Sequence, residues 1–145
     1  MVNNNLTPKT NKLKKTFNPK LLRVKKNSDI LLYGDFGLKS KVNKMISITE
    51  LESLKKTILK KIKRIGKLWI RVFPHFFLTK KPLEVRMGNG KGNFDKWSVN
   101  VSKGIILFEF KIISKDVILD IVQLIKECSS KLSIPLKLIK KDDIC

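Results

Sequence analysis

The sequence has few of the residues that hold metals or perform catalysis. Only one histidine, His75, and two cysteines, Cys128 and Cys145, occur among its 145 residues. The cysteines lack the spacing of a metal site, and no cysteine or carboxylate cluster lies beside His75 in the sequence. We therefore predict no metal, no cofactor, no catalytic residue and no enzymatic activity. Cys128 is interpreted as a small core residue and Cys145 as a terminal thiol.

Long hydrophobic runs are also missing. No uninterrupted apolar stretch approaches the ~20 residues that a helix needs to span a bilayer. The hydrophobic fraction is nevertheless 42%, which is too high for a disordered basic tail. A chain of 145 residues can bury one hydrophobic core, so the sequence predicts a single folded domain that does not span a membrane.

Acidic residues are scarce. Twelve Asp and Glu stand against 32 Lys and Arg, which gives a net charge of +20. Self-repulsion on this scale is hard to tolerate unless a polyanion neutralises it. The charge is concentrated in residues 1–108, which hold 25 basic and 6 acidic residues, whereas residues 109–145 hold 7 and 6. The composition therefore predicts a nucleic acid or an anionic membrane as the partner.

Alanine is absent and arginine is rare, since 28 of the 32 basic residues are lysine. We interpret this as codon pressure from an AT-rich genome. Under such pressure lysine replaces arginine at sites that need only a point charge. Arginine is retained where its planar guanidinium group, with several N–H donors, is needed. The candidates for specific contacts are Arg23, Arg64, Arg71 and Arg86. For Arg23 and Arg64, retention by chance is an equal alternative.

The chain divides near residue 28. Residues 1–28 contain eight basic residues, no acidic residue and two prolines, and are predicted to form an extended basic arm. This segment lacks the apolar region of a signal peptide and the Arg and Ser enrichment of a transit sequence, so it is not interpreted as a targeting peptide. Residues 29–145 are predicted to form the single folded domain.

Hydrophobic periodicity predicts an α+β domain in which two helices pack on one side of a mostly antiparallel sheet. The first helix should follow a cap at Ser47 or Thr49 and stop at Gly66, and the second should follow Ser114 and bury a stripe from Val117 to Cys128. Strands are predicted at residues 30–36 (ending in a turn at Gly37), 67–73, 97–101, 105–113 and 134–139.

The first predicted helix has two unlike faces. One face carries an apolar stripe of Leu51, Leu54, Ile58, Ile62 and Ile65, and the other carries Lys55, Lys56, Lys60, Lys61, Lys63 and Arg64. Apart from Glu52, four residues before Lys56, no carboxylate is spaced to pair with these cations, so most of them repel one another until a phosphate backbone neutralises them. The alternative is that these cations only form a solvated surface. Binding of the helix to a membrane surface is less favoured, because its apolar stripe is needed to cover the sheet.

Residues 87–93 contain three glycines in five residues and are predicted to form a loop between two strands, with Arg86 in the strand before it. Glycine-rich backbone can approach an anion closely, and Arg86, Lys91 and Lys96 supply charge. Phe94 and Trp97 could stack on bases, although Trp97 fits the core better. A flexible solvent loop is the alternative. A nucleotide-binding loop is disfavoured, because that motif requires a Ser or Thr after its lysine and none follows Lys91.

Two segments resemble the signature segments of the large-subunit ribosomal protein L-sixteen family. They are Gly66–Pro74 and Lys81–Asn93, the latter followed by Trp97, and the spacing between them also matches. Weaker likeness extends through Gly34–Lys39, the helix from Ile48 and Lys131–Pro135.

The resemblance implies an α+β protein packed against ribosomal RNA near the peptidyl-transferase region, beside the aminoacyl end of the A-site tRNA. The glycine loop would reach toward that centre, and the protein would support late subunit assembly while the RNA performs the chemistry. Large-subunit rRNA, A-site tRNA and neighbouring ribosomal proteins are the implied partners. The predicted RNA-binding residues are Lys9, Lys12, Lys14, Lys15, Lys55, Lys56, Lys60, Lys63, Arg71, Arg86, Gly88, Gly90, Lys91 and Gly92.

The sequence also departs from that family. Asn89 stands where the loop usually has another basic residue, the arm lacks the usual Gly-Arg stretch, and Leu136–Lys140 replaces a Thr-rich end. Together with the lysine-rich composition and the lack of an import signal, this divergence suggests that the protein is translated inside an organelle. The mitochondrion is the first choice and the plastid the second. A free-standing RNA-binding regulator is the alternative function.

Overall fold

The computed structural model describes residues 6–8, 30–62, 66–112 and 118–141, and within them it confirms the α+β class. These residues form two helices and seven strands. In chain order the elements are β1 (Phe36–Ser40), β2 (Lys44–Ser47), α1 (Ile48–Ile62), β3 (Gly66–Ile70), β4 (Phe76–Lys80), β5 (Asn93–Val101), β6 (Ile106–Ile112), α2 (Ile118–Lys131) and β7 (Leu136–Lys140).

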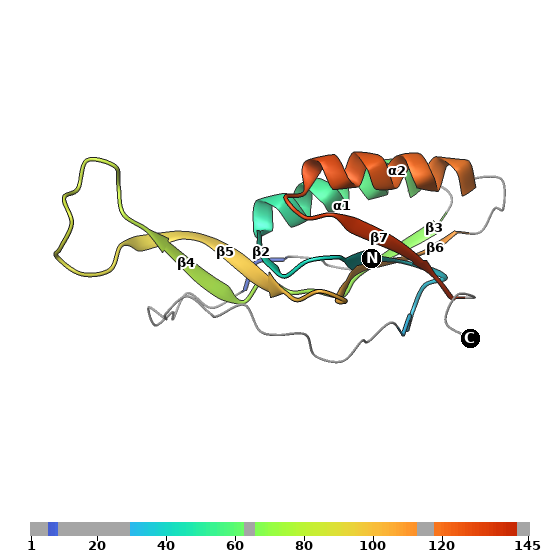
Figure 1. Ribbon diagram of the computed structural model, residues 1–145, viewed down its shortest axis with the longest axis horizontal. Coiled ribbons are helices and arrows are strands. Elements are labelled where there is room, and N and C mark those ends of the chain that lie inside the picture. The colour runs from blue at the N-terminus through green and yellow to red at the C-terminus, as the bar shows by residue number, and fades with distance from the viewer. Residues whose placement is uncertain (1–5, 9–29, 63–65, 113–117, 142–145) are drawn as a thin grey trace.

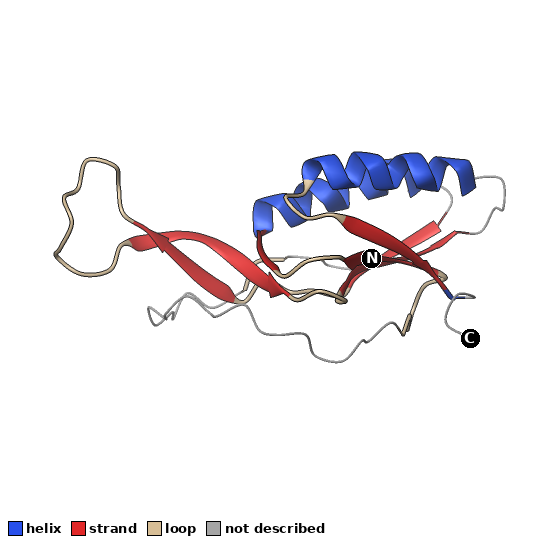
Figure 2. Cartoon of the chain, in the orientation of Figure 1, coloured by secondary structure: helices blue, strands red, loops and turns tan. Residues whose placement is uncertain are grey.

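The strands form two antiparallel sheets. The four-stranded sheet has the order β3-β6-β1-β7, and the three-stranded sheet has the order β2-β5-β4. Helices α1 and α2 lie side by side over one face of the four-stranded sheet (Figure 1). Strands β4 and β5 form a hairpin that projects away from the helices and ends in a long loop (Figure 2).

Helix α1 begins and packs as its sequence predicts. The Glu50 carboxylate accepts a hydrogen bond from the Ser47 amide at 2.8 Å, and Ser47 Oγ accepts one from the Glu50 amide at 3.4 Å. This reciprocal pair is a capping box, and it confirms Ser47 as the cap. The predicted apolar stripe is buried at Leu51, Leu54, Ile58 and Ile62, whereas Ile65 lies outside the described residues.

Helix α2 confirms the core role of Cys128. The cysteine side chain is fully buried, and burial raises the pKa of its thiol to about 11. Such a thiol stays protonated and unreactive at neutral pH. Ser114 and Val117, predicted to cap and open this helix, lie outside the described residues, as does Cys145.

The predicted strand over residues 30–36 is wrong. Strand β1 begins only at Phe36, and Gly37 lies inside it rather than in a turn. The backbone amides of Leu32, Tyr33 and Gly34 donate to the carboxylate of Glu109 instead of joining a strand ladder. This segment therefore lies against the face of the sheet that the helices leave free.

The strand before the glycine loop is also not the predicted one. Residues 81–92, including Arg86, form no strand, and β4 at Phe76–Lys80 precedes the loop instead. β4 pairs with β5, which begins at Asn93, four residues before the predicted start. The segment between Pro74 and Pro82 is too short for its hydrophobic pattern alone to identify it as a strand.

Candidate nucleic-acid interface

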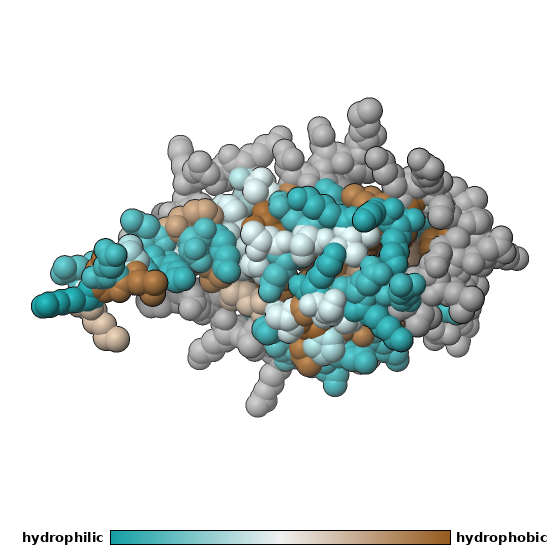
Figure 3. All heavy atoms as spheres, turned by 90° about the horizontal axis from the view of Figure 1, so that it is seen from above, coloured by the Kyte–Doolittle hydropathy of each residue, from teal (hydrophilic) through white to brown (hydrophobic). Residues whose placement is uncertain are grey.

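The basic face of α1 turns away from the core. Lys56 and Lys60 are exposed, Lys55 and Lys61 are half-buried, and the stripe beneath them is covered by the sheet. Seen from the helix side, hydrophilic residues spread over this surface (Figure 3). Lys63 and Arg64 lie outside the described residues.

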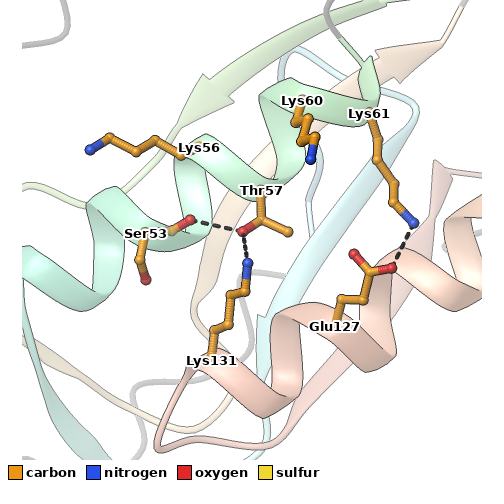
Figure 4. Close-up of a pocket in the computed structure, with 7 residues that line it drawn as sticks. All are labelled: Ser53, Lys56, Thr57, Lys60, Lys61, Glu127 and Lys131. Carbon is orange, nitrogen blue, oxygen red and sulfur yellow. Dashed lines mark hydrogen bonds and ion pairs between the residues drawn. The ribbon is translucent and has the colours of Figure 1, made fainter.

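A groove of about 600 Å³ runs between α1 and α2 and adds one lysine, Lys131, to this face. Lys131 Nζ donates to Thr57 Oγ1 at 2.7 Å, and Lys61 Nζ lies 2.8 Å from Glu127 Oε1 (Figure 4). The hydrogen bond from Lys61 lowers the pKa of the Glu127 carboxyl, so Glu127 is ionised at neutral pH. The groove lining consists of Ser53, Lys56, Thr57, Lys60, Lys61, Glu127 and Lys131.

Four lysines and one carboxylate thus line the groove, which keeps an excess of three positive charges. Lys131 comes from a different helix, so sequence spacing gave no sign that it joins the α1 face. It lies in the last turn of α2. The arrangement can hold an anion such as a phosphate group.

The glycine loop has the backbone conformation that its composition requires. Three consecutive residues have positive φ: Gly88 at 105°, Asn89 at 51° and Gly90 at 80°. Glycine adopts such values freely, and asparagine tolerates the left-handed region better than most residues. Lys81 Nζ donates to the carbonyl of Gly88 and so links the two sides of the loop.

The loop displays charged and apolar side chains to solvent. Arg86 and Lys91 are exposed, and Leu83 and Met87 are 96% and 102% exposed. These exposed apolar side chains lie in the loop at the end of the projecting hairpin. Among the predicted loop residues, Gly88, Gly90 and Lys91 are exposed, and Gly92 is half-buried where the two strands meet.

The two aromatic residues after the loop differ in exposure. Trp97 is 8% exposed, which confirms its core role. Phe94 is 47% exposed, and its ring centroid lies 4.8 Å from that of Phe77. Phe94 therefore packs along the hairpin while keeping part of its ring accessible.

Arg71 has a partner inside the protein. Its guanidinium forms an ion pair with Glu109, whose side chain is fully buried in β6. Burial raises the pKa of Glu109, but hydrogen bonds from the Tyr33, Gly34 and Leu32 amides and the charge of Arg71 outweigh it, so the pKa lies below its usual value. Sequence reasoning missed Glu109, although a lone carboxylate inside the apolar run Ile106–Phe110 was a signal.

Four of the predicted RNA-binding residues belong to the basic arm and lie outside the described residues: Lys9, Lys12, Lys14 and Lys15. Near the start of the arm, Leu6 is buried in the hydrophobic core. Leu6 is thus anchored to the domain.

Within the described ranges, no group of three or more His, Cys, Asp or Glu side chains could hold a metal ion. The helices in these ranges are all too short or too polar to cross a membrane. The charged groups gathered in the groove and at the loop are mainly cationic.

Comparison with known proteins identifies the family. The model of the family "Ribosomal protein L16p/L10e" matches residues 8–139. The large ribosomal subunit protein uL16 of Ureaplasma parvum serovar 3 is 36% identical over 138 residues, which cover 95% of this chain and 98% of that protein. The protein of the same name from Malacoplasma penetrans is 38% identical, and the match covers 96% of this chain and 97% of that protein. The protein of the same name from Rhizobium etli is 35% identical, and the match covers 94% of this chain and 97% of that protein.

These relatives are ribosomal proteins, which confirms the prediction that the chain is not an enzyme. The match spans both sheets and both helices, so it does not rest on the two signature segments alone. The chain belongs to the ribosomal protein L16p/L10e family.

Proposed function

We propose that this chain is a structural constituent of the large ribosomal subunit, where it binds large-subunit rRNA near the peptidyl-transferase region. Family membership supports the ribosomal role. The observation that supports RNA binding is the basic surface of α1 and α2, where four lysines and a single carboxylate line one groove. A phosphate backbone relieves the repulsion among these lysines.

The hairpin loop is the proposed contact with the functional centre. It projects from the domain, displays Arg86 and Lys91, and exposes Met87 fully. Arginine can hold a phosphate with two hydrogen bonds or stack on a base, whereas lysine can do neither. Arg86 fixes the loop against rRNA, which supports late subunit assembly and the positioning of A-site tRNA. Arg71, paired with Glu109, supports the face of the sheet opposite the helices.

The proposed location is the mitochondrial ribosome, with the plastid ribosome as second choice. The support is compositional: the chain has 28 lysines, four arginines and no alanine. The relatives reported above are bacterial, and identity to them is 35–38%. Fractionation of organelles and cytosol with an antibody to the chain distinguishes these locations.

Sedimentation tests the ribosomal role. The wild-type chain should sediment wholly with the large subunit in high salt, whereas a free-standing regulator would be washed off. Arg86→Lys keeps the charge but removes the planar guanidinium group, so immature large subunits should accumulate while the melting temperature of the free protein stays unchanged. Normal subunit profiles for Arg86→Lys would contradict the role given to Arg86, and loss of the wild-type chain from subunits would contradict the ribosomal role itself.

The α1 lysines give a second test. Lys56→Glu combined with Lys60→Glu places two negative charges beside the phosphate backbone, so incorporation into the subunit should fall at least tenfold. The matched control is Lys41→Glu with Lys103→Glu, two exposed residues outside the helices with the same change in net charge. Quantitative mass spectrometry of purified subunits measures both. Equal incorporation of the two double variants would show that the α1 face is only solvated.

A further inference from the structure

The face of the four-stranded sheet opposite the helices carries a second basic surface. Along β3 and just beyond it, Lys67, Trp69 and Arg71 alternate with residues that face the helices. Trp69 lies directly opposite the buried Glu109 of β6, and Lys67 lies directly opposite Lys111. Directly opposed residues of neighbouring strands point to the same face, so these side chains share one surface.

Tyr33 is stacked onto this surface from the preceding segment. Its ring is nearly parallel to that of Trp69, with centroids 6.1 Å apart and an interplanar angle of 23°. The guanidinium carbon of Arg71 lies 5.8 Å from the Tyr33 ring centroid. Tyr33 nevertheless remains 58% exposed. A large part of its ring is therefore available to a further molecule.

The position of Tyr33 is fixed by buried groups. Its amide donates to Glu109 Oε2 at 2.7 Å, and the same carboxylate is paired with Arg71. The amides of Leu32 and Gly34 hold the same carboxylate at 3.2 and 3.1 Å. An exposed aromatic ring that is anchored in this way loses little conformational entropy when it binds a flat partner.

The charges beside the ring point to an anionic partner. Lys67 and Lys111 are exposed and directly opposed, an arrangement that is unfavourable for like charges without a counterion. A nucleotide supplies both the flat base for Tyr33 and the phosphate for these lysines. An acidic peptide would satisfy the lysines but leave the aromatic ring uncovered.

We propose that Tyr33, supported by Trp69 and Arg71, is a stacking site for one unpaired RNA base whose phosphate is held by Lys67 and Lys111. This inference rests on the proposed RNA-binding function and adds to it a site on the opposite side of the sheet from the helices. The recognised feature is a single-stranded nucleotide rather than a sequence, because every base offers a π face.

Binding by the full-length chain tests the site with two RNA probes of equal length, a hairpin with an unpaired loop and a fully paired duplex. Tyr33→Leu should weaken hairpin binding roughly tenfold and leave duplex binding unchanged, because stacking on one base is lost. Tyr33→Phe keeps the ring and should bind both probes like wild type. Lys67→Gln combined with Lys111→Gln should also weaken hairpin binding.

Two results would overturn the proposal. Unchanged hairpin binding by a folded Tyr33→Leu variant removes the stacking site but leaves RNA binding intact, whereas failure of the wild type to bind either probe removes the proposed function as well. If Tyr33→Leu does not fold, ultraviolet cross-linking of the wild-type chain in intact subunits decides. A nucleotide attached to the Tyr33 peptide supports the site, and cross-links confined to other peptides or to protein overturn it.

Discussion

Glu109→Ala should lower the free energy of unfolding by about 3–5 kcal/mol, because it removes one partner of a buried ion pair. The loss leaves the Arg71 guanidinium without its carboxylate and the amides of Leu32, Tyr33 and Gly34 without an acceptor. Domains of this size are stable by only about 5–15 kcal/mol, so the variant should be close to unfolding at physiological temperature.

Urea denaturation of the full-length chain measures this loss. The matched control is Glu84→Ala, which makes the same change of charge at an exposed loop residue and should change stability by less than about 0.5 kcal/mol. Glu109→Gln keeps the shape of the side chain and one acceptor oxygen, so its stability should fall between the two. Equal stability of the Glu109 and Glu84 variants would show that the buried pair contributes nothing.

The same comparison has a defined pH dependence. The pKa of Glu109 in the folded protein lies below its usual value of 4.5, so the unfolded chain binds a proton more readily. The stabilisation from Glu109 is therefore complete above pH 4.5 and is lost as the pH falls through the folded-state pKa. The stability difference between wild type and Glu109→Ala should be constant at neutral pH and shrink in acid.

Gly66→Ala should destabilise the domain by about 2–3 kcal/mol, at the upper end of what overpacking costs. A Cβ at Gly66 would overlap the carbonyl oxygen of Lys111 and lie 3.0 Å from Ile62 Cγ2. The first atom belongs to the backbone of the neighbouring strand, so the clash can be relieved only by moving β3 or β6.

Thermal unfolding tests the Gly66 prediction, with Lys67→Ala as the control. Lys67 is the next residue of the same strand and is exposed, so its truncation should leave the melting temperature nearly unchanged. A Gly66→Ala variant as stable as the Lys67→Ala variant would show that the strands separate at little cost.

Local signals explain which parts of the fold could be predicted. The cap at Ser47 and the stripe from Leu51 to Ile62 depend on residues within one helix, and both were correct. The core positions of Trp97 and Cys128 also followed from local pattern. In each case the periodicity of the element and the burial of its side chains agree.

Partners distant in the sequence explain what could not be predicted. The segment before β1 has the composition of a strand, but its amides bond to a carboxylate 75–77 residues away. Arg71 was selected by composition as a contact for RNA, and its internal partner Glu109 is 38 residues away. Lys131 joins the α1 lysines only because the two helices pack together.

Ser98 lies where three strands meet, since β5 pairs with β4 from Asn93 to this residue and with β2 from this residue to Val101. Opposite it is Ser47, the cap of α1. Beyond Ser98, the five residues Asn93–Trp97 extend about 17 Å, so each degree of rotation at Ser98 moves the strand end by about 0.3 Å. The base of the hairpin thus lies beside the cap of α1, and beyond it β4 and β5 pair only with each other. A rotation of a few degrees at Ser98 would displace the glycine loop by an ångström or more.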